Sequence, residues 1–318
     1  MDKINSKNVV NFVAKYSIYC ITLLFMIICA IVNNRFLTLE NLTNILRQIS
    51  VYALLAFAES VCIISGNLDL AAASTLIFAG CSSIFVYVSS GSLLLAAIVA
   101  ILLGMLINLV SGSIVAFLDV PPFVATLGMQ MAVRGACYVL TGGATIINTG
   151  ENFRAIGQGY IGPIPNPIII MILCAIIFWI LLDRTRLGRN FYALGGNREA
   201  ARASGISIRK YIILSYLVAG AFTGLAGIVF SSRINAGAPN GATGYEGQGI
   251  AASVIGGIGF AGGTGNAFGA VIGAIVIGII NNILNLMGVD SYVQQIINGL
   301  VIIVAVALDT FTRSRRTS

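Results

Sequence analysis

The chain has no histidine, and its cysteines lack the spacing of a metal site. The absence of histidine from 318 residues removes the commonest metal ligand and the commonest proton-transfer side chain. The six cysteines fall within apolar segments and never as C-x-x-C, so we expect small buried hydrophobic residues. They are Cys20, Cys29, Cys62, Cys81, Cys137 and Cys174. We therefore predict no metal site, no bound cofactor and no catalytic residues in this chain.

Lysine is rare, and its positions exclude one nucleotide-binding motif. It occurs only as Lys3, Lys7, Lys15 and Lys210, so the GGTG sequence at 262–265 cannot belong to a G-x-x-x-x-G-K-[ST] phosphate-binding loop. A membrane enzyme would normally cluster Asp, His or Arg at one membrane face. The basic segment of this chain has Arg without matching acids, which argues against an enzyme.

Charge as a whole is scarce, whereas apolar residues dominate. Charged residues make up 9% and hydrophobic residues 58% of the chain, against roughly 25% charged residues in soluble domains. The mean hydropathy is +0.95. A membrane-spanning helix needs about 20 apolar residues, and the apolar blocks accommodate about ten such helices. We predict an all-α polytopic membrane protein with about ten transmembrane helices in a single domain, residues 1–318.

The positions of the basic residues predict the orientation. Thirteen of the 18 Lys and Arg lie before the first apolar run, in the loop 184–210, or at the C-terminus. Short basic loops face the cytoplasm, so both termini and this loop are predicted to be cytoplasmic if the spans between them are even in number. The first apolar run, 16–32, is long enough to span and lacks a clear cleavage site, so we expect no cleavable signal peptide.

The loop 184–210 is predicted to contain a short helix. Asn197 is a suitable N-cap, Glu199 lies in the first turn, and Gly205 can adopt the left-handed conformation that ends a helix. A helix of about two turns is marginal alone in water and gains order by packing. One interpretation is a docking element for a cytosolic partner. The other is a basic loop that only fixes topology.

The second span is predicted to be interrupted. Residues 33–50 mix polar and apolar residues at helical spacing, and we expect an interfacial helix on the outer side. The span then begins at Val51 and is broken near Gly66-Asp69 before the apolar pattern resumes. Such a break is tolerated in a membrane only where it is buried in protein or lines a cavity.

Polar side chains at membrane depth are the candidate transport residues. Glu59 lies inside an apolar run, Asp69 lies at the break and Arg134 lies in another span. They either line a polar path or form an internal pair of Arg134 with Glu59 or Asp69 that holds helices together. No chain of several acids is present, which weakens a proton-coupled carrier but not a sodium-coupled one. The predicted path residues are Glu59, Asn67, Asp69, Ser74, Arg134, Asn281 and Asn282.

Short motifs in order along nearly the whole chain match a known family. They are Ala193-Leu194-Gly195-Gly196-Asn197 with Ala200-Ala201 and Ser204-Gly205-Ile206; 123–128 with Arg134-Gly135; Gly244-Tyr245-Glu246; Ile250-Ala251-Ala252; Gly256-Gly257; Gly262-Gly263 with Gly265; and Asn281-Asn282. Together they resemble the bacterial ABC-importer permeases of the ribose, galactose and xylose type.

The resemblance implies the partners and location of the chain. Such a permease pairs with a second copy or a sister permease in the bacterial cytoplasmic (inner) membrane. A cytoplasmic ATPase with two fused cassettes, which binds the ATP and magnesium, would grip the central loop, and an extracytoplasmic binding protein would deliver a monosaccharide. The ATPase-coupling residues would be Gly195, Gly196, Asn197, Arg198, Glu199, Ala200, Ala201, Arg202, Ser204 and Gly205. An ion-coupled secondary carrier is the alternative function.

The chain departs from the family around the predicted break. The family usually reads G-M-T and then G-G-I-D-L-S-V-G-S. Here the corresponding residues are Ala58-Glu59-Ser60 and the stretch from Gly66 to Ser74, in which Asp69 and Ser74 are kept. A carboxylate where methionine is usual leaves open which sugar, pentose or hexose, is transported.

Overall fold

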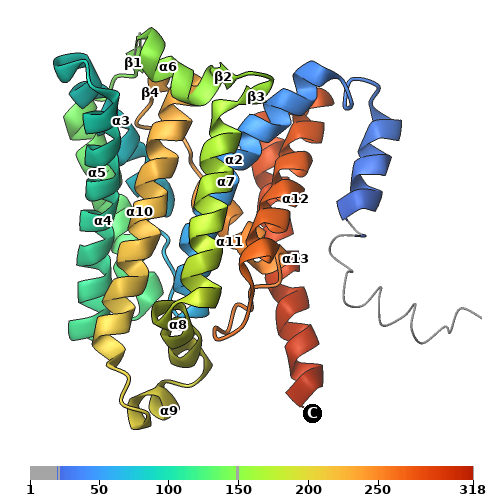
Figure 1. The fold of residues 1–318 in the computed structure, drawn as a ribbon. Coiled ribbons are helices and arrows are strands. Elements are labelled where there is room, and N and C mark those ends of the chain that lie inside the picture. Colours follow the sequence, from blue (N-terminus) through green and yellow to red (C-terminus); the bar gives the residue numbers. More distant parts are fainter. Residues whose placement is uncertain (1–19, 21, 148–149, 318) are drawn as a thin grey trace, which may run out of the picture.

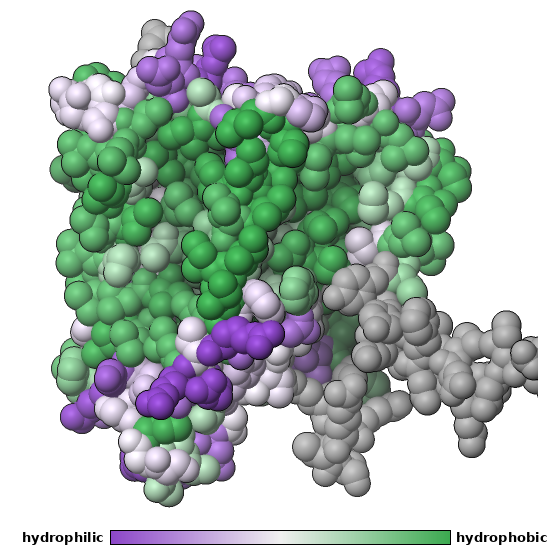
Figure 2. Space-filling view, viewed as in Figure 1, coloured by the Kyte–Doolittle hydropathy of each residue, from purple (hydrophilic) through white to green (hydrophobic). Residues whose placement is uncertain are grey.

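The chain folds into a bundle of long apolar helices with polar ends. A computed structural model describes residues 20, 22–147 and 150–317 (Figure 1). Figure 2 shows an apolar belt between two polar ends of the molecule. Within the described residues, eight helices are long and apolar enough to cross a membrane. These are α2 (Leu39–Ile64), α3 (Ala72–Ser90), α4 (Leu93–Phe117), α5 (Pro122–Thr141), α7 (Asn166–Trp179) with the π-helical segment Ile180–Arg184, α10 (Ile208–Ile234), α12 (Ala267–Leu286) and α13 (Ser291–Thr317).

Shorter elements lie between the long helices. The short helices are α6 (Glu151–Gln158), α8 (Arg186–Gly196), α9 (Arg198–Ala203) and α11 (Tyr245–Ile255). The strand β1 (Ile146–Ile147) pairs antiparallel with β4 (Ala236–Gly237), and β2 (Tyr160–Ile161) pairs with β3 (Ile164–Pro165). Figure 1 shows α6 and the strands at one end of the bundle, and α8, α9 and the C-terminus at the other. The predicted all-α polytopic membrane fold is confirmed.

The first predicted span, 16–32, lies only partly within the described residues. Thr22–Val32 form an apolar helix shorter than a crossing requires. The basic residues Lys3, Lys7 and Lys15 lie outside the described residues.

The predicted interfacial helix at 33–50 is wrong, because α2 is one continuous helix of 26 residues from Leu39 to Ile64. Thr38 caps it by accepting a hydrogen bond from the Asn41 amide at 3.4 Å, and neither Gly nor Pro interrupts it afterwards. Asn41, one of the polar residues that suggested an interface, has its partner in the bundle. Asn41 and Asn282 on α12 exchange side-chain hydrogen bonds of 3.0 and 2.7 Å.

The predicted break after α2 is confirmed. The helix ends at Ile64, and α3 begins at Ala72. Between them, Gly66 has φ +73°, a left-handed conformation that suits glycine. Asp69 accepts hydrogen bonds from the Ala71 amide and from the Asn108 side chain on α4, both at 2.9 Å. The break is therefore an ordered turn fixed from a neighbouring helix.

Glycines allow the long helices to touch through their backbones. A Cβ at Gly220 on α10 would fall on the Gly104 carbonyl oxygen of α4. α12 approaches α11 in the same way, because a Cβ at Gly273 would fall on the Ala252 carbonyl oxygen of α11. Helices in lipid associate through such close packing.

We predict that Gly220→Ala destabilises the fold, whereas Gly128→Ala does not. The added methyl at position 220 meets backbone that has no room to move, and overpacking costs about 1–3 kcal/mol. At Gly128 on α5 nothing lies within 4 Å of the added carbon, and alanine gains up to about 1 kcal/mol of helix propensity. Thermal unfolding of the purified protein in detergent measures both. Equal melting temperatures for the two variants would contradict the α4–α10 packing.

Candidate functional site

The helix predicted in the central loop is present as α9. It has six residues, and the Asn197 side chain caps it by accepting a hydrogen bond from the Ala200 amide at 3.0 Å. Gly205 closes it with φ +79°, and its amide donates to the Arg202 carbonyl at 3.0 Å. Asn197 also ends α8, so the two helices share one joint.

The exposed surface of α9 carries a charge pair. Arg202 and Glu199 approach to 3.3 Å, with 67% and 78% of their side chains exposed. An exposed pair of this kind contributes about 0–1 kcal/mol to stability. These charges therefore contribute little to holding the fold and are available to a partner. Ala201 is buried on the other side of the helix.

Behind α9, three turns meet at what we call the glycine junction, formed by Gly66, Gly195, Gly262 and Gly263. A Cβ at Gly195, in the last turn of α8, would fall on the Ile64 carbonyl oxygen at the end of α2. The same carbonyl accepts a 2.9 Å hydrogen bond from the Gly263 amide in the α11–α12 loop. Gly262 and Gly263 have φ +89° and +70°, where side chains are disfavoured. The α2–α3 break, the α8–α9 joint and the α11–α12 loop are therefore in direct backbone contact.

Two side chains reinforce the glycine junction from α8 and α9. The Arg198 guanidinium donates to the Gly66 carbonyl at 3.1 Å and to the Asn67 side-chain oxygen at 3.4 Å. The Tyr192 hydroxyl donates to the Gly265 carbonyl at 3.1 Å. Burial, with a smaller effect of Asp183, raises the pKa of Tyr192 to about 12, so its hydroxyl keeps the proton that it donates at neutral pH. A displacement of α9 therefore acts on both turns.

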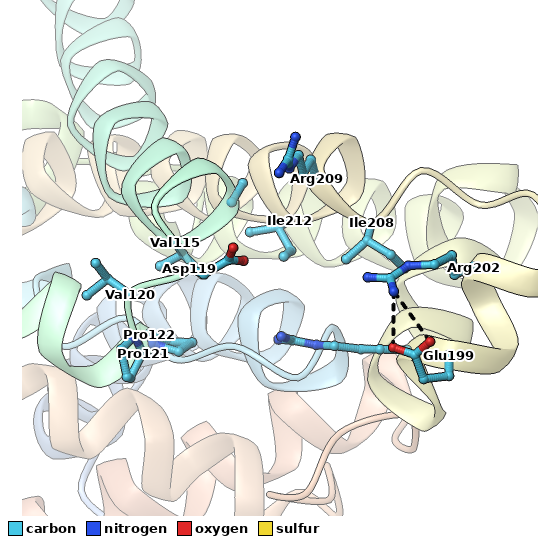
Figure 3. Close-up of a pocket in the computed structure, with 12 residues that line it drawn as sticks. Val115, Asp119, Val120, Pro121, Pro122, Glu199, Arg202, Ile208, Arg209 and Ile212 are labelled. Atoms are coloured by element: carbon cyan, nitrogen blue, oxygen red, sulfur yellow. Dashed lines mark hydrogen bonds and ion pairs between the residues drawn. The ribbon is translucent and has the colours of Figure 1, made fainter.

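A charged cavity lies beside α9, with a volume of about 380 Å³. Figure 3 shows Glu199 and Arg202 on one side of this cavity and the α4–α5 turn, with Asp119, on the other. Its charged lining residues are Asp119, Arg198, Glu199, Arg202 and Arg209. Sequence reasoning missed the part played by Asp119 and Arg209.

The candidate path residues near the break lie in a polar part of the bundle. Asn67, Asp69 and Ser74 belong to the break and the start of α3, and Glu59 lies in the part of α2 that precedes it. Glu59 is fully buried against α11, where Gly249 packs on its side chain. Among the described residues, neither its carboxylate oxygens nor the Ser74 hydroxyl has a hydrogen-bond partner. Buried polar groups without partners are costly, and they mark positions where water or a solute can supply hydrogen bonds.

The other candidate path residues lie elsewhere. Arg134 donates to the Pro239 and Gly241 carbonyls, both at 2.8 Å. The alternative interpretation, in which Arg134 pairs with Glu59 or Asp69, is wrong for the described structure, because its guanidinium instead satisfies carbonyls of the turn before α11. Asn281 binds the Ile277 carbonyl at 3.0 Å, and Asn282 is engaged with Asn41 on α2. The structure therefore does not bring the seven residues into one site.

Several polar partners escaped sequence reasoning because each is a single residue in an apolar segment. Their only sequence signal is their polarity, since their partners are far away in the chain. They are Asn108, which binds Asp69; Gln130, which binds Glu246; and Asn298, which binds Asn281.

Comparison with known proteins points to transport permeases. The pattern of a family described as "Branched-chain amino acid transport system / permease component" matches residues 41–306, from α2 into α13. No solved structure matches the chain.

Named relatives are similar over most of their length. The ribose import permease protein RbsC of Escherichia coli (strain K12) is 40% identical over 292 residues, which cover 90% of this chain and 91% of the relative. RbsC of Bacillus subtilis (strain 168) is 37% identical over 288 residues, or 90% and 89% of the two chains. The galactose/methyl galactoside import permease protein MglC of Escherichia coli (strain K12) is 33% identical over 335 residues, or 99% and 100%.

We predict that Gly195→Ala loosens α9, whereas the neighbouring Gly196→Ala does not. The first methyl falls on the Ile64 carbonyl oxygen, whereas nothing lies within 4 Å of the second. Overpacking of about 1–3 kcal/mol corresponds to a roughly 5- to 150-fold increase in local opening. The rate of tryptic cleavage after Arg198 and Arg202 in the purified protein measures this opening. Equal cleavage rates in the two variants would show that Gly195 does not hold α9.

Proposed function

The chain belongs to this family of transport-system permease components, and from this premise we propose that it forms the translocation path for a monosaccharide in an ATP-binding-cassette importer. The observation that carries the proposal is the full-length similarity to named sugar permeases. The family is one of transport subunits, so this chain is a permease and not an enzyme. ATP hydrolysis belongs to a separate subunit.

The substrate class follows from the relatives rather than from the family description. That description refers to branched-chain amino acids. The named relatives import ribose and galactose, and an allose permease is 36% identical over 275 residues. Similarity to several sugar permeases favours a ribose-like pentose or a hexose. Glu59, which stands where the family usually has methionine, leaves the identity of the sugar open.

The ATPase partner of this proposal, with two fused cassettes, docks on α9 and the charged cavity. The exposed Glu199 and Arg202, together with the cavity wall at Asp119, offer charges of both signs to a complementary surface. ATP binding closes the ATPase and displaces α9. The glycine junction then transmits this displacement to the α2–α3 break and to the α11–α12 loop, and the path opens alternately to the two sides.

The remaining partners cover other surfaces. A second copy or a sister permease completes the path, and an extracytoplasmic sugar-binding protein docks at the end that carries α6 and the strand pairs. This arrangement puts α8, α9 and both termini in the cytoplasm of a bacterium, with the chain in its inner membrane. The basic loop and the C-terminus at one end of the bundle support it. Adding Thr22–Val32 and the half-length α11 to the eight long helices gives about ten segments.

In this proposal Glu59 lines the translocation path and meets the passing solute. A fully buried carboxylate without a hydrogen-bond partner is unfavourable in a bundle unless water or solute hydroxyls reach it. Asn282, whose amide is engaged with Asn41, instead holds α2 to α12.

The function is tested by uptake into proteoliposomes that contain the permease, its ATPase and its binding protein. We expect radiolabelled D-ribose, D-allose or D-galactose to accumulate only when ATP reaches the ATPase. Accumulation driven by a sodium or proton gradient, with the permease alone in the membrane, would instead establish the ion-coupled carrier.

We predict that exchanging the two charges of α9, by Glu199→Arg with Arg202→Glu, removes the ATPase without unfolding the permease. The pair is exposed, and reversing it against the helix dipole costs at most about 1 kcal/mol per charge. An ATPase surface that is complementary to Glu199 and Arg202, however, faces a charge of its own sign at both positions of the variant. Co-purification of the ATPase is expected to fall at least about tenfold, the effect of roughly 1.4 kcal/mol.

The matched control is Glu151→Arg with Arg154→Glu in the short helix α6 at the opposite end, where the charges have the same spacing. It should retain the ATPase. Full retention of the ATPase by the α9 variant would contradict the proposed docking.

A further inference from the structure

A second cavity, of about 220 Å³, lies between the first turn of α11 and residues 295–302 of α13. It lies away from α9, towards the end at which α13 begins, since the C-terminus of α13 is at the α9 end (Figure 1). The volume is several times the roughly 30 Å³ share of one water molecule in the liquid. Apart from glycines, its lining is polar with one apolar side chain: Thr243, Glu246, Gln248, Gln295, Asn298 and Ile302.

Three of the lining side chains carry a buried oxygen without a hydrogen-bond partner among the described residues. These are Oε2 of Glu246, Oε1 of Gln248 and Oδ1 of Asn298. Gln248 is only 7% exposed, so water outside the cavity does not compensate for the missing bond. A buried acceptor left unpaired costs about 1–3 kcal/mol. A donor in the cavity would recover this free energy after a small side-chain rotation, because the three oxygens have almost no accessible surface as they lie.

Two of these side chains are held in place from behind. The other carboxylate oxygen of Glu246 accepts a hydrogen bond from Gln130 on α5 at 3.2 Å. The Asn298 amide group donates to the Asn281 side chain at 3.0 Å, and Asn281 in turn donates to the Ile277 carbonyl of α12. Each side chain thus has one polar atom engaged with the bundle and one left free. Such preorganised groups lose little conformational entropy when a ligand binds.

The chemistry of the lining selects one class of ligand. Within the described part of the chain neither Lys nor Arg lines the cavity, so an anion would lack a counter-charge. Carboxamides present donors and acceptors together, and the carboxylate adds further acceptors. A hydroxyl group donates and accepts at once, so a solute with several neighbouring hydroxyls can satisfy this set, with its carbon face against Ile302.

We propose that the cavity between α11 and α13 is a subsite for a neutral polyhydroxylated solute, recognised by Glu246, Gln248, Gln295 and Asn298. The assignment rests on the proposed function, because the solute would be the imported monosaccharide. It places recognition on this chain itself, in the half of the bundle remote from the ATPase-coupling helix.

The test uses the complete transporter in proteoliposomes, with D-ribose as the probe and saturating binding protein. Gln248→Met keeps the length of the side chain and removes its amide group. Gln295→Met makes the same change near the start of α13, where the side chain is exposed and the substitution does not disturb folding. Each variant loses hydrogen bonds to the sugar. We expect the half-saturating D-ribose concentration to rise about three- to tenfold, with the maximal rate and ATP dependence little changed.

The matched control is Gln294→Met. This neighbouring side chain binds Asn285 and the Val289 carbonyl and does not line the cavity. The subsite is overturned if the half-saturating D-ribose concentration is unchanged in both cavity variants, or if it rises equally in the control. In either case ATP-driven uptake by the wild-type transporter still supports the proposed function. A wild-type transporter that accumulates none of D-ribose, D-allose and D-galactose overturns the proposed function, and the subsite assignment with it. Melting temperatures confirm that the variants are folded.

Discussion

The arrangement of this permease depends on the contact of Gly195 with the last carbonyl of α2. No side chain fits between them, so the end of α8 lies directly on the backbone of the most buried spanning helix. The same carbonyl is hydrogen-bonded to Gly263, which brings the α11–α12 loop to the same point. Segments in backbone contact of this kind cannot move far independently of one another, because packed protein interiors move as units rather than deforming continuously.

This contact relates the polar end of the molecule to its interior. The exposed charges of α9 lie on one side of the glycine junction, and the break that contains Asn67 and Asp69 lies on the other. Arg198 crosses between them by binding the Gly66 carbonyl. The unpartnered Glu59 lies further along α2, and the cavity at α11 and α13 lies towards the opposite end of the bundle. A partner that displaces α9 therefore acts directly on segments that border the buried polar groups.

Local features of this architecture were predictable from the sequence, and contacts between distant residues were not. The cap at Asn197, the glycine at 205 and the break near Gly66 depend on neighbours in the chain, and all three are present. The continuity of α2 was missed because Asn41 in its polar first turn binds Asn282 on α12, 241 residues away. Arg134 was misassigned for a similar reason. Its charge suggested an acid partner, whereas the fold supplies backbone carbonyls.

Hydrogen–deuterium exchange can show whether α9 and the α2–α3 break move together through the glycine junction. The complete transporter would be compared in its nucleotide-free and ATP-bound states, with peptides covering 64–71, 197–205 and 259–266. We predict that amide protection changes in all three segments when ATP binds. A change confined to 197–205, with the other two segments unaltered, would contradict it.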